Sequence, residues 1–145
     1  MKAWTRAYAI DANMILRFLL RDHPTQSPKA KAIMDAVQDG RLSVVCDPIQ
    51  LAEVAWVLRS TYKLDPQHIA DSLAPVVNLE SFILPDKARY LHALALSASS
   101  TRGYGDACAC ATALDECDGK LFSFDKKLSR VEGISRFEDW PTTDN

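Results

Sequence analysis

The stretch YAIDANMILRFLL, residues 8–20, sets the pattern that the rest of the chain repeats. Tyr8–Ile10 is a short apolar run that stops at Asp11, as expected of a buried strand that leads into a polar break. Met14–Leu20 follows as a short apolar helix. A strand, a carboxylate and a helix therefore follow one another within a single short segment.

Runs rich in β-branched residues, which favour strands, alternate along the chain with longer stretches that carry helix signals. Asp47-Pro48 and Asp65-Pro66 predict helix starts, because Asp caps a helix and Pro fits its first position. This alternation predicts an α/β fold with a mainly parallel sheet. The expected strands are 8–10, 42–46, 79–84, 120–124 and 134–137, and the expected helices are 14–20, 27–39, 49–62, 66–77, 86–99, 106–117 and a short one from 126.

The size of the chain, 145 residues, favours a single domain over residues 1–140, with 141–145 as a short C-terminal tail. Its 17 basic and 19 acidic side chains give a formal charge of −2. That balance excludes a strongly basic protein that coats nucleic acid, but it leaves room for a local basic face.

The cysteines and histidines do not form a zinc motif. None of the four cysteines belongs to a C-x-x-C pair, and the three histidines stand far apart, so the cysteines are expected to be buried thiols in a reducing compartment. Arg6, Asp11, Asn13 and Arg17 interrupt any signal-peptide core, and no apolar stretch is long enough to span a bilayer. We therefore expect a cytoplasmic protein without a membrane segment.

Four acidic residues have no obvious structural role. Asp11 and Asp125 each follow an expected strand, and ligands of parallel α/β sheets bind at the carboxyl ends of the strands. Glu53 interrupts the apolar run LAEVAWVL early in a helix that follows another strand. Asp106 opens an Ala-rich helix after Gly-Tyr-Gly, where a role at the helix N-terminus is the competing explanation. We expect these four carboxylates at one edge of the sheet.

Such a cluster requires a cation or protonation. Two carboxylates about 4 Å apart repel by about 4 kcal/mol at an effective dielectric constant near 20. Ligation by oxygen alone favours Mg²⁺ or Mn²⁺, and such a metal suits the attack of water on a phosphodiester. Asn13 either orients a carboxylate or caps the following helix, and Ser123 either supports Asp125 or is a buried strand serine.

Basic residues flank several of these acids and are candidates for phosphate contacts, although a solvated helix face explains each one equally simply. Two pairs have the four-residue spacing of one helix face. The aromatic residues Trp56, Tyr62 and Tyr104 are candidates for base stacking. The apolar faces around Leu51–Leu58 and Ala30–Val37 are candidates for a dimer or partner interface. The basic candidates are the pairs Arg17 with Arg21 and Arg59 with Lys63, together with Arg102, Lys126, Lys127 and Arg130.

Four segments resemble the motifs of PIN-domain proteins, most closely the VapC-type ribonuclease toxins of toxin–antitoxin pairs. They are AIDANMILRFLL, PIQLAEVAWVLRSTYKL, GYGDACACATAL and KLFSFDKKL, and they occur in the family's order. Ala12 departs from the family's usual Thr after the first Asp. The resemblance implies a three-layer α/β/α fold around a four- or five-stranded parallel sheet. It implies Mg²⁺- or Mn²⁺-dependent hydrolysis of RNA, a homodimer and neutralisation by a small antitoxin.

Carried over to this chain, the resemblance makes Asp11, Glu53, Asp106 and Asp125 the metal ligands and catalytic acids, supported by Asn13 and Ser123. Two alternatives remain open. A haloacid-dehalogenase-like phosphatase also has an Asp after its first strand and a later Gly-Asp, but it wants a second Asp where this chain has Asn13. A non-catalytic PIN-like module would bind RNA or protein without cleaving it.

Overall fold

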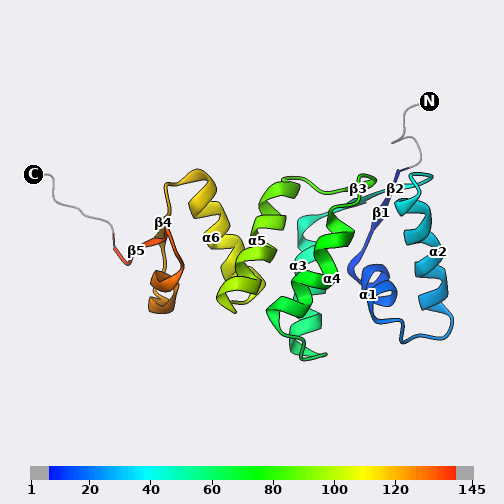
Figure 1. Ribbon diagram of the computed structural model, residues 1–145, viewed down its shortest axis with the longest axis horizontal. Coiled ribbons are helices and arrows are strands. Elements are labelled where there is room, and N and C mark those ends of the chain that lie inside the picture. The colour runs from blue at the N-terminus through cyan, green and yellow to red at the C-terminus, as the bar shows by residue number, and fades with distance from the viewer. Residues whose placement is uncertain (1–6, 140–145) are drawn as a thin grey trace, which may run out of the picture.

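The computed structural model describes residues 7–139. Six α-helices and five strands alternate along this part of the chain, as the sequence predicts (Figure 1). The strands are β1 (Ala7–Ile10), β2 (Ser43–Cys46), β3 (Phe82–Ile83), β4 (Lys120–Phe122) and β5 (Ser135–Phe137). The helices are α1 (Ala12–Leu20), α2 (Gln26–Gln38), α3 (Pro48–Ser60), α4 (Pro66–Val77), α5 (Lys87–Ser100) and α6 (Tyr104–Glu116), with a 3₁₀ helix, η2, at Lys126–Arg130.

Aspartates begin three of the helices. The carboxylates of Asp11, Asp47 and Asp65 accept hydrogen bonds from the backbone N–H groups of Met14 (2.9 Å), Ile49 (2.8 Å) and His68 (2.8 Å). Each bond satisfies an N–H that the first helical turn leaves without a partner. The two Asp-Pro signals are therefore confirmed, and α1 is capped by Asp11 rather than by Asn13.

Ser27 and Asp86 are residue types that commonly cap helices, and they stand where the sequence predicts helix starts, but neither is an N-cap that accepts a capping hydrogen bond here. Ser27 lies inside α2, where its Oγ accepts from the backbone N–H of His23 at 3.2 Å. Asp86 precedes α5 with a left-handed backbone (φ 55°) and makes no capping hydrogen bond through its side chain. Here Pro85 precedes Asp86. At the starts of α3 and α4, by contrast, Asp precedes Pro and has the extended backbone of a capping residue.

Strands β1, β2 and β3 form a parallel sheet in that order, and Ile10 pairs with Cys46. Val44, Cys46 and Phe82 of this sheet are buried in the main core. The stripes around Ala30–Val37 and Leu51–Leu58 also supply buried core residues, so these faces are not free for a partner. The expected strand 79–84 is reduced to Phe82–Ile83.

Strands β4 and β5 form a second parallel sheet, whereas a single sheet of four or five strands was expected. Helices α5 and α6 lie between the two sheets (Figure 1) and pack on each other through the buried small side chains of Ala93, Ala107 and Ala111. The segment Lys120–Phe137, which we call the β4–β5 unit, then packs on α6 at the end of the long axis opposite to the three-stranded sheet (Figure 1).

The result is a mixed α/β fold with a parallel sheet, consistent with a three-layer α/β/α arrangement. Within residues 7–139, none of the helices has the length and apolar character needed to cross a membrane. The expected C-terminal tail, 141–145, lies outside the described residues.

Candidate acidic site

Asp11 is exposed at the carboxyl end of β1, directly before α1. Its Oδ1 accepts from the backbone N–H of Met14, so the carboxylate stabilises the start of α1 while it faces solvent. A strand that ends and a helix that begins at one residue fix the position of this side chain. The strand-end location predicted for Asp11 is confirmed.

A cavity of about 1010 Å³ runs beside β1 and β2. Asp11 and Asp47 line it at the carboxyl ends of these two strands. We call it the β1 groove, and its walls are mostly apolar side chains from β1, β2, α1 and α2. Gln50 also lines it and accepts from the backbone N–H of Ala12 at 2.9 Å, which ties the start of α3 to the start of α1. Sequence reasoning treated Asp47 only as a cap and missed Gln50, which carries no signal of its own.

Glu53 and Asp106 lie on two helices that contact each other, α3 and α6. Glu53 is exposed, whereas its neighbours Val54 and Ala55 are buried in the core. Asp106 is exposed in the first turn of α6, where Gly103 is the N-cap. Asp106 is therefore not the N-cap itself, but the expected position at the helix N-terminus is confirmed, and the helix dipole favours a carboxylate there.

Asp125 is exposed at the start of η2, beyond the end of β4. Its Oδ1 accepts from the backbone N–H of Lys127, and its own backbone N–H donates to Ser123 Oγ, both at 3.0 Å. Ser123 thus orients the backbone of Asp125 rather than its carboxylate. Asn13 lies exposed in the first turn of α1.

One chain does not gather the four acids. Among residues 7–139, no three Asp, Glu, His or Cys side chains lie close enough to hold a metal ion together. Asp11 belongs to the three-stranded sheet and Asp125 to the β4–β5 unit, and these parts lie toward opposite ends of the molecule (Figure 1). The described part of a single chain therefore does not by itself fit a site for a divalent cation.

A smaller cavity of about 220 Å³ lies between α3, α5 and α6. Trp56, Arg59 and Tyr104 line it, and Trp56 is 64% exposed, which excludes a core role for that ring. Burial raises the pKa of Tyr104, and its hydroxyl has no hydrogen-bond partner among the described residues. Tyr104 therefore remains protonated at neutral pH.

Neither of the two expected pairs of basic residues lies wholly within one helix. Helix α1 ends at Leu20, and Arg21 has a left-handed backbone (φ 53°), while Lys63 (φ 59°) lies beyond the end of α3 at Ser60. Arg17 forms an ion pair with Asp22 at 2.8 Å. The expectation that Arg59 and Lys63 share a helix face is therefore wrong, because the chain leaves the helix between them.

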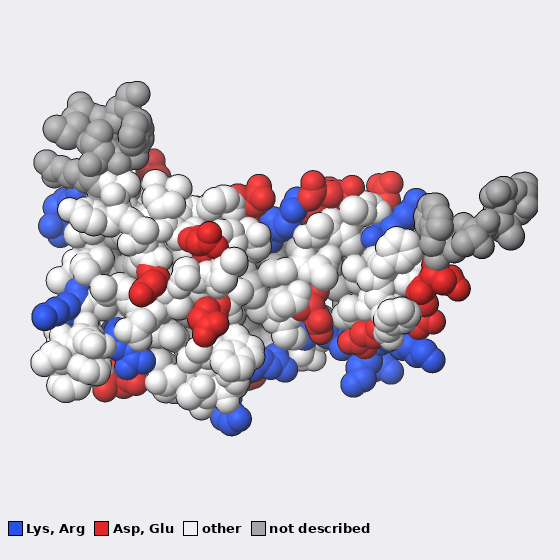
Figure 2. All heavy atoms as spheres, turned by 180° about the vertical axis from the view of Figure 1, so that it is seen from behind, with Lys and Arg blue, Asp and Glu red and all other residues white. Residues whose placement is uncertain are grey.

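The basic residues near Asp125 do come together. Arg102 Nη2 donates to the backbone carbonyl of Lys127 at 2.8 Å, which fastens the loop before α6 to η2. Lys126, Lys127 and Arg130 are exposed on η2. In Figure 2, lysine and arginine side chains gather at the lower edge of the C-terminal end, with acidic side chains beside them, and separate acidic side chains lie on the mostly uncharged face of the opposite half.

Comparison with known protein families supports the resemblance of the four motifs to PIN-domain proteins. The profile of the PIN domain family matches residues 8–134, a range that contains all four acids. No curated protein matches the chain.

Proposed function

The chain belongs to the PIN domain family, and from this premise we propose that it is a metal-dependent endoribonuclease that hydrolyses RNA phosphodiester bonds. PIN domains are typically nucleases that use divalent metal ions. The observation that carries the proposal is the family match across Asp11, Glu53, Asp106 and Asp125, each of which is exposed.

The four acids are proposed as the catalytic and metal-binding residues, with Asn13 and Ser123 as supporting polar groups. Mg²⁺ or Mn²⁺ is the proposed cofactor, because a donor set of carboxylates alone suits these ions, which stabilise charge on a phosphate and activate water. The described residues of one chain do not bring three of these ligands together. Forming the metal site therefore requires the acids to be brought closer than they are in the structure of one chain.

The basic residues are proposed to hold the RNA backbone. Arg102, Lys126 and Lys127 are connected through the hydrogen bond from Arg102 to Lys127 and lie close in sequence to Asp125. Arg17, Arg21, Arg59 and Lys63 are further candidates at other positions. Phosphate contacts of this kind position RNA without reading its sequence.

We also propose that the protein is the toxin of a toxin–antitoxin pair, with a small protein as its antitoxin. The support is the resemblance of the four motifs to VapC-type ribonucleases. Induced expression is expected to arrest bacterial growth, and Asp11→Asn is expected to relieve the arrest. An arrest of equal strength with Asp11→Asn would contradict a toxin that acts through this site.

The nuclease activity is tested by cleavage of RNA in the presence of Mg²⁺ or Mn²⁺. Asp11→Asn and Asp106→Asn are each expected to lower the cleavage rate by at least about a hundredfold, which is the scale of losing a group that stabilises charge in the transition state. Asp71→Asn is the matched control, because Asp71 is an exposed carboxylate on α4 that only accepts from Gln67 at 2.9 Å. Full activity in Asp11→Asn would remove Asp11 from the site.

The same preparation separates the two alternatives. Family membership argues against the haloacid-dehalogenase-like phosphatase, and p-nitrophenyl phosphate is expected to remain intact. A non-catalytic PIN-like module would bind RNA equally well before and after Asp11→Asn and would cleave neither substrate.

A further inference from the structure

Among the described residues, β1, β3, β4 and β5 each have one unpaired edge, because each pairs with a single neighbour. Within residues 7–139, β1 pairs only with β2, and β4 pairs only with β5. An edge strand presents free N–H and C=O groups that favour the addition of another strand. Both edges are apolar as well as unpaired, since Tyr8 on β1 and Phe122 on β4 are each 66% exposed.

The surfaces beside these edges are both apolar. The β1 groove is a mostly apolar hollow, and Val45 and Ile83 continue its apolar character across the sheet as partly exposed side chains. The β4–β5 unit carries three exposed phenylalanines, Phe122, Phe124 and Phe137. Phe124 is 83% exposed. The rings of Phe122 and Phe137 pack edge to face, with 6.5 Å between their centroids. Exposed apolar patches of this kind mark interaction surfaces.

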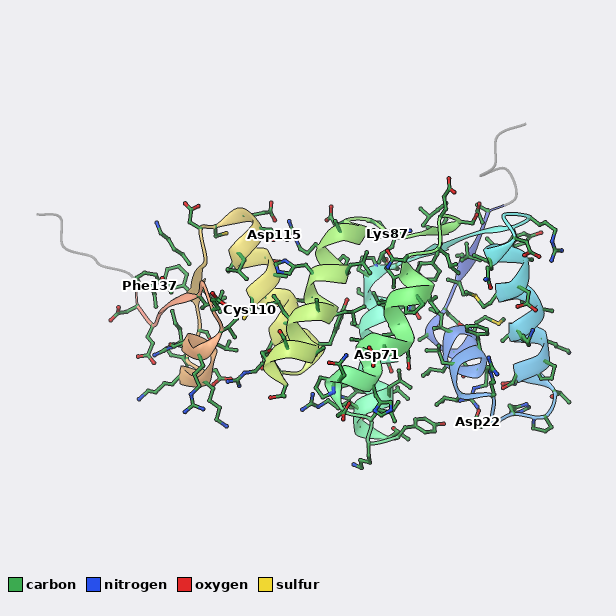
Figure 3. The ribbon with its side chains drawn as sticks, viewed as in Figure 1. Asp22, Asp71, Lys87, Cys110, Asp115 and Phe137 are labelled. Atoms are coloured by element: carbon green, nitrogen blue, oxygen red, sulfur yellow. The ribbon has the colours of Figure 1, made fainter. Side chains whose placement is uncertain are left out.

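The β4–β5 unit is fastened away from the β1 groove of its own chain. Cys110 on α6 packs against Leu128 and Val131, and Figure 3 shows Cys110 on the side of α6 toward the C-terminal strands. Helix α6 is held to α5 by an ion pair between Arg89 and Glu116 (2.6 Å) and by a hydrogen bond between His92 Nδ1 and Asp115 Oδ1 (3.0 Å). Docking the unit in its own groove would require these contacts to break.

We infer that the β1 groove receives the β4–β5 unit of a second copy of this chain, so that β1 of one copy pairs in parallel with β4 of the other. Every strand pairing of the described residues is parallel. The groove and the unit lie toward opposite ends of the long axis (Figure 1), so two copies related by a two-fold axis satisfy both pairs of edges at once. Each composite sheet then has five strands, in the order β3-β2-β1 followed by β4-β5 of the second copy.

The charges of the two surfaces are also complementary. Asp11 and Asp47 stand at the carboxyl ends of β1 and β2, whereas Lys126, Lys127 and Arg130 follow β4. Parallel pairing of β1 with β4 brings the basic η2 of one copy to the acidic end of the other. The attraction favours this docking orientation and raises the rate of association.

The pairing also completes the acidic site, an extension that rests on the proposed function. The carboxyl ends of neighbouring parallel strands meet at one edge of a sheet, so Asp125 of the second copy comes beside Asp11. The absence of a group of three acids among the described residues of one chain then follows from the assembly. The catalytic unit is a pair of chains, each of which contributes part of each site.

The first experiment measures mass by size-exclusion chromatography with light scattering over a dilution series. The wild type is expected at twice the single-chain mass of 16.1 kDa, and Phe124→Asp is expected at the single-chain mass with an unchanged circular dichroism spectrum. Trp56→Asp is the matched control, an exposed aromatic outside the groove and the unit, and is expected to remain a dimer. A wild type at the single-chain mass, or a ladder of larger species, would overturn the closed two-fold pairing.

The second experiment mixes two inactive variants. Refolding Asp11→Asn together with Asp125→Asn places both substitutions of a mixed dimer in one composite site and leaves the other intact. Random pairing predicts about one quarter of the wild-type cleavage rate. A dimer without recovered activity would overturn the shared site. A wild type that cleaves no RNA would instead refute the proposed function, while the mass of Phe124→Asp still decides the pairing.

Discussion

Asp11 combines a structural and a proposed chemical role that two substitutions separate. The side chain caps α1 through Met14 and presents its carboxylate to solvent at the end of β1. Asn caps a helix about as well as Asp but carries no charge, whereas Ala does neither. The pair of variants therefore distinguishes the contribution to folding from the contribution to catalysis.

We expect Asp11→Ala to lower the free energy of unfolding by about 1 kcal/mol and Asp11→Asn to leave it nearly unchanged, while both abolish RNA cleavage. Urea denaturation and the cleavage assay check the two effects. Equal destabilisation by both variants would show that the charge, rather than the cap, stabilises this end of the helix.

Cys46 is the last residue of β2 and is fully buried in the core, and burial raises the pKa of its thiol from 9.0 to about 11. The unfolded chain releases this proton near pH 9 and the folded chain does so only near pH 11. The stabilising contribution is therefore complete below about pH 9 and is lost as the pH rises toward 11.

Between these two pH values, we expect Cys46 to lower the free energy of unfolding by up to about 1.4 kcal/mol per pH unit. Denaturation at several pH values, compared between the wild type and Cys46→Ala, isolates this slope. Cys117→Ala, at an exposed cysteine, is the control and is expected to keep the wild-type slope. Parallel pH profiles for the wild type and Cys46→Ala would contradict the assignment.

At the scale of elements, the connection from α6 to β4 depends on a glycine. Gly119 has a left-handed backbone (φ 78°), and a Cβ there would clash with the backbone carbonyl oxygen of Gly133. Its own carbonyl accepts from the N–H of Ser135 at 2.8 Å, so the close approach aligns β4 with β5. Gly40 has nearly the same φ (76°) but open space around its missing side chain.

We therefore expect Gly40→Ala to destabilise the protein by about 1 kcal/mol through backbone strain alone, and Gly119→Ala to cost clearly more. Thermal denaturation of the two variants measures the difference in stability. That difference is the free-energy cost of moving β4 and β5 apart to make room for the added Cβ. Equal losses would mean that the strands adjust without penalty.

The contact between α5 and α6 is built from alanines, and this explains much of what the sequence did not reveal. Ala93 on α5 and Ala107 and Ala111 on α6 are buried at the contact but give a weak apolar periodicity, so these helix faces do not stand out in the sequence. Replacing Ala107 with Leu would overfill this space, whereas Ala109 is exposed on the same helix.

We expect Ala107→Leu to lower the free energy of unfolding by about 1–3 kcal/mol, with little effect from Ala109→Leu. Chemical denaturation measures both. A tolerated Ala107→Leu would show that α6 moves easily on α5 and would weaken the argument that the β4–β5 unit is fixed.

At the scale of the whole molecule, charge is distributed unevenly although the formal total is −2. Basic side chains gather at the C-terminal end, and acidic ones stand apart on the face of the other half (Figure 2). A total near zero thus excludes uniform coating of nucleic acid but not local binding of a phosphate backbone.

If η2 holds RNA phosphates, Lys126→Gln with Lys127→Gln is expected to reduce the slope of log affinity against log salt by about 1.4 for single-stranded RNA. Filter binding at several salt concentrations measures the slope. Lys29→Gln with Lys31→Gln, at two exposed lysines on α2, is the control pair. An unchanged slope in the first pair would remove η2 from the RNA path.

Local signals predicted most of the elements, whereas the assembly of the sheet depended on distant contacts. The Asp-Pro pairs fixed the starts of α3 and α4 because capping acts within a few residues. The separation of β4 from β1 could not be predicted, because strand pairing depends on how α5 and α6 pack rather than on the pattern of either strand. The positions of Asp11 and Asp125 at strand ends were therefore predictable, but their separation in one chain was not.

The pairing of β1 with β2 joins Ala7 to Ser43, so this sheet consists of residues that leave the ribosome well before β4 is synthesised. During that interval the nascent chain carries an apolar groove and an unpaired strand with no β4–β5 unit yet available. Neighbouring ribosomes on one messenger RNA hold such incomplete nascent chains close together. This proximity exposes the chains to co-translational aggregation. The rate of translation between β2 and β5 should therefore influence how much protein is recovered in folded form.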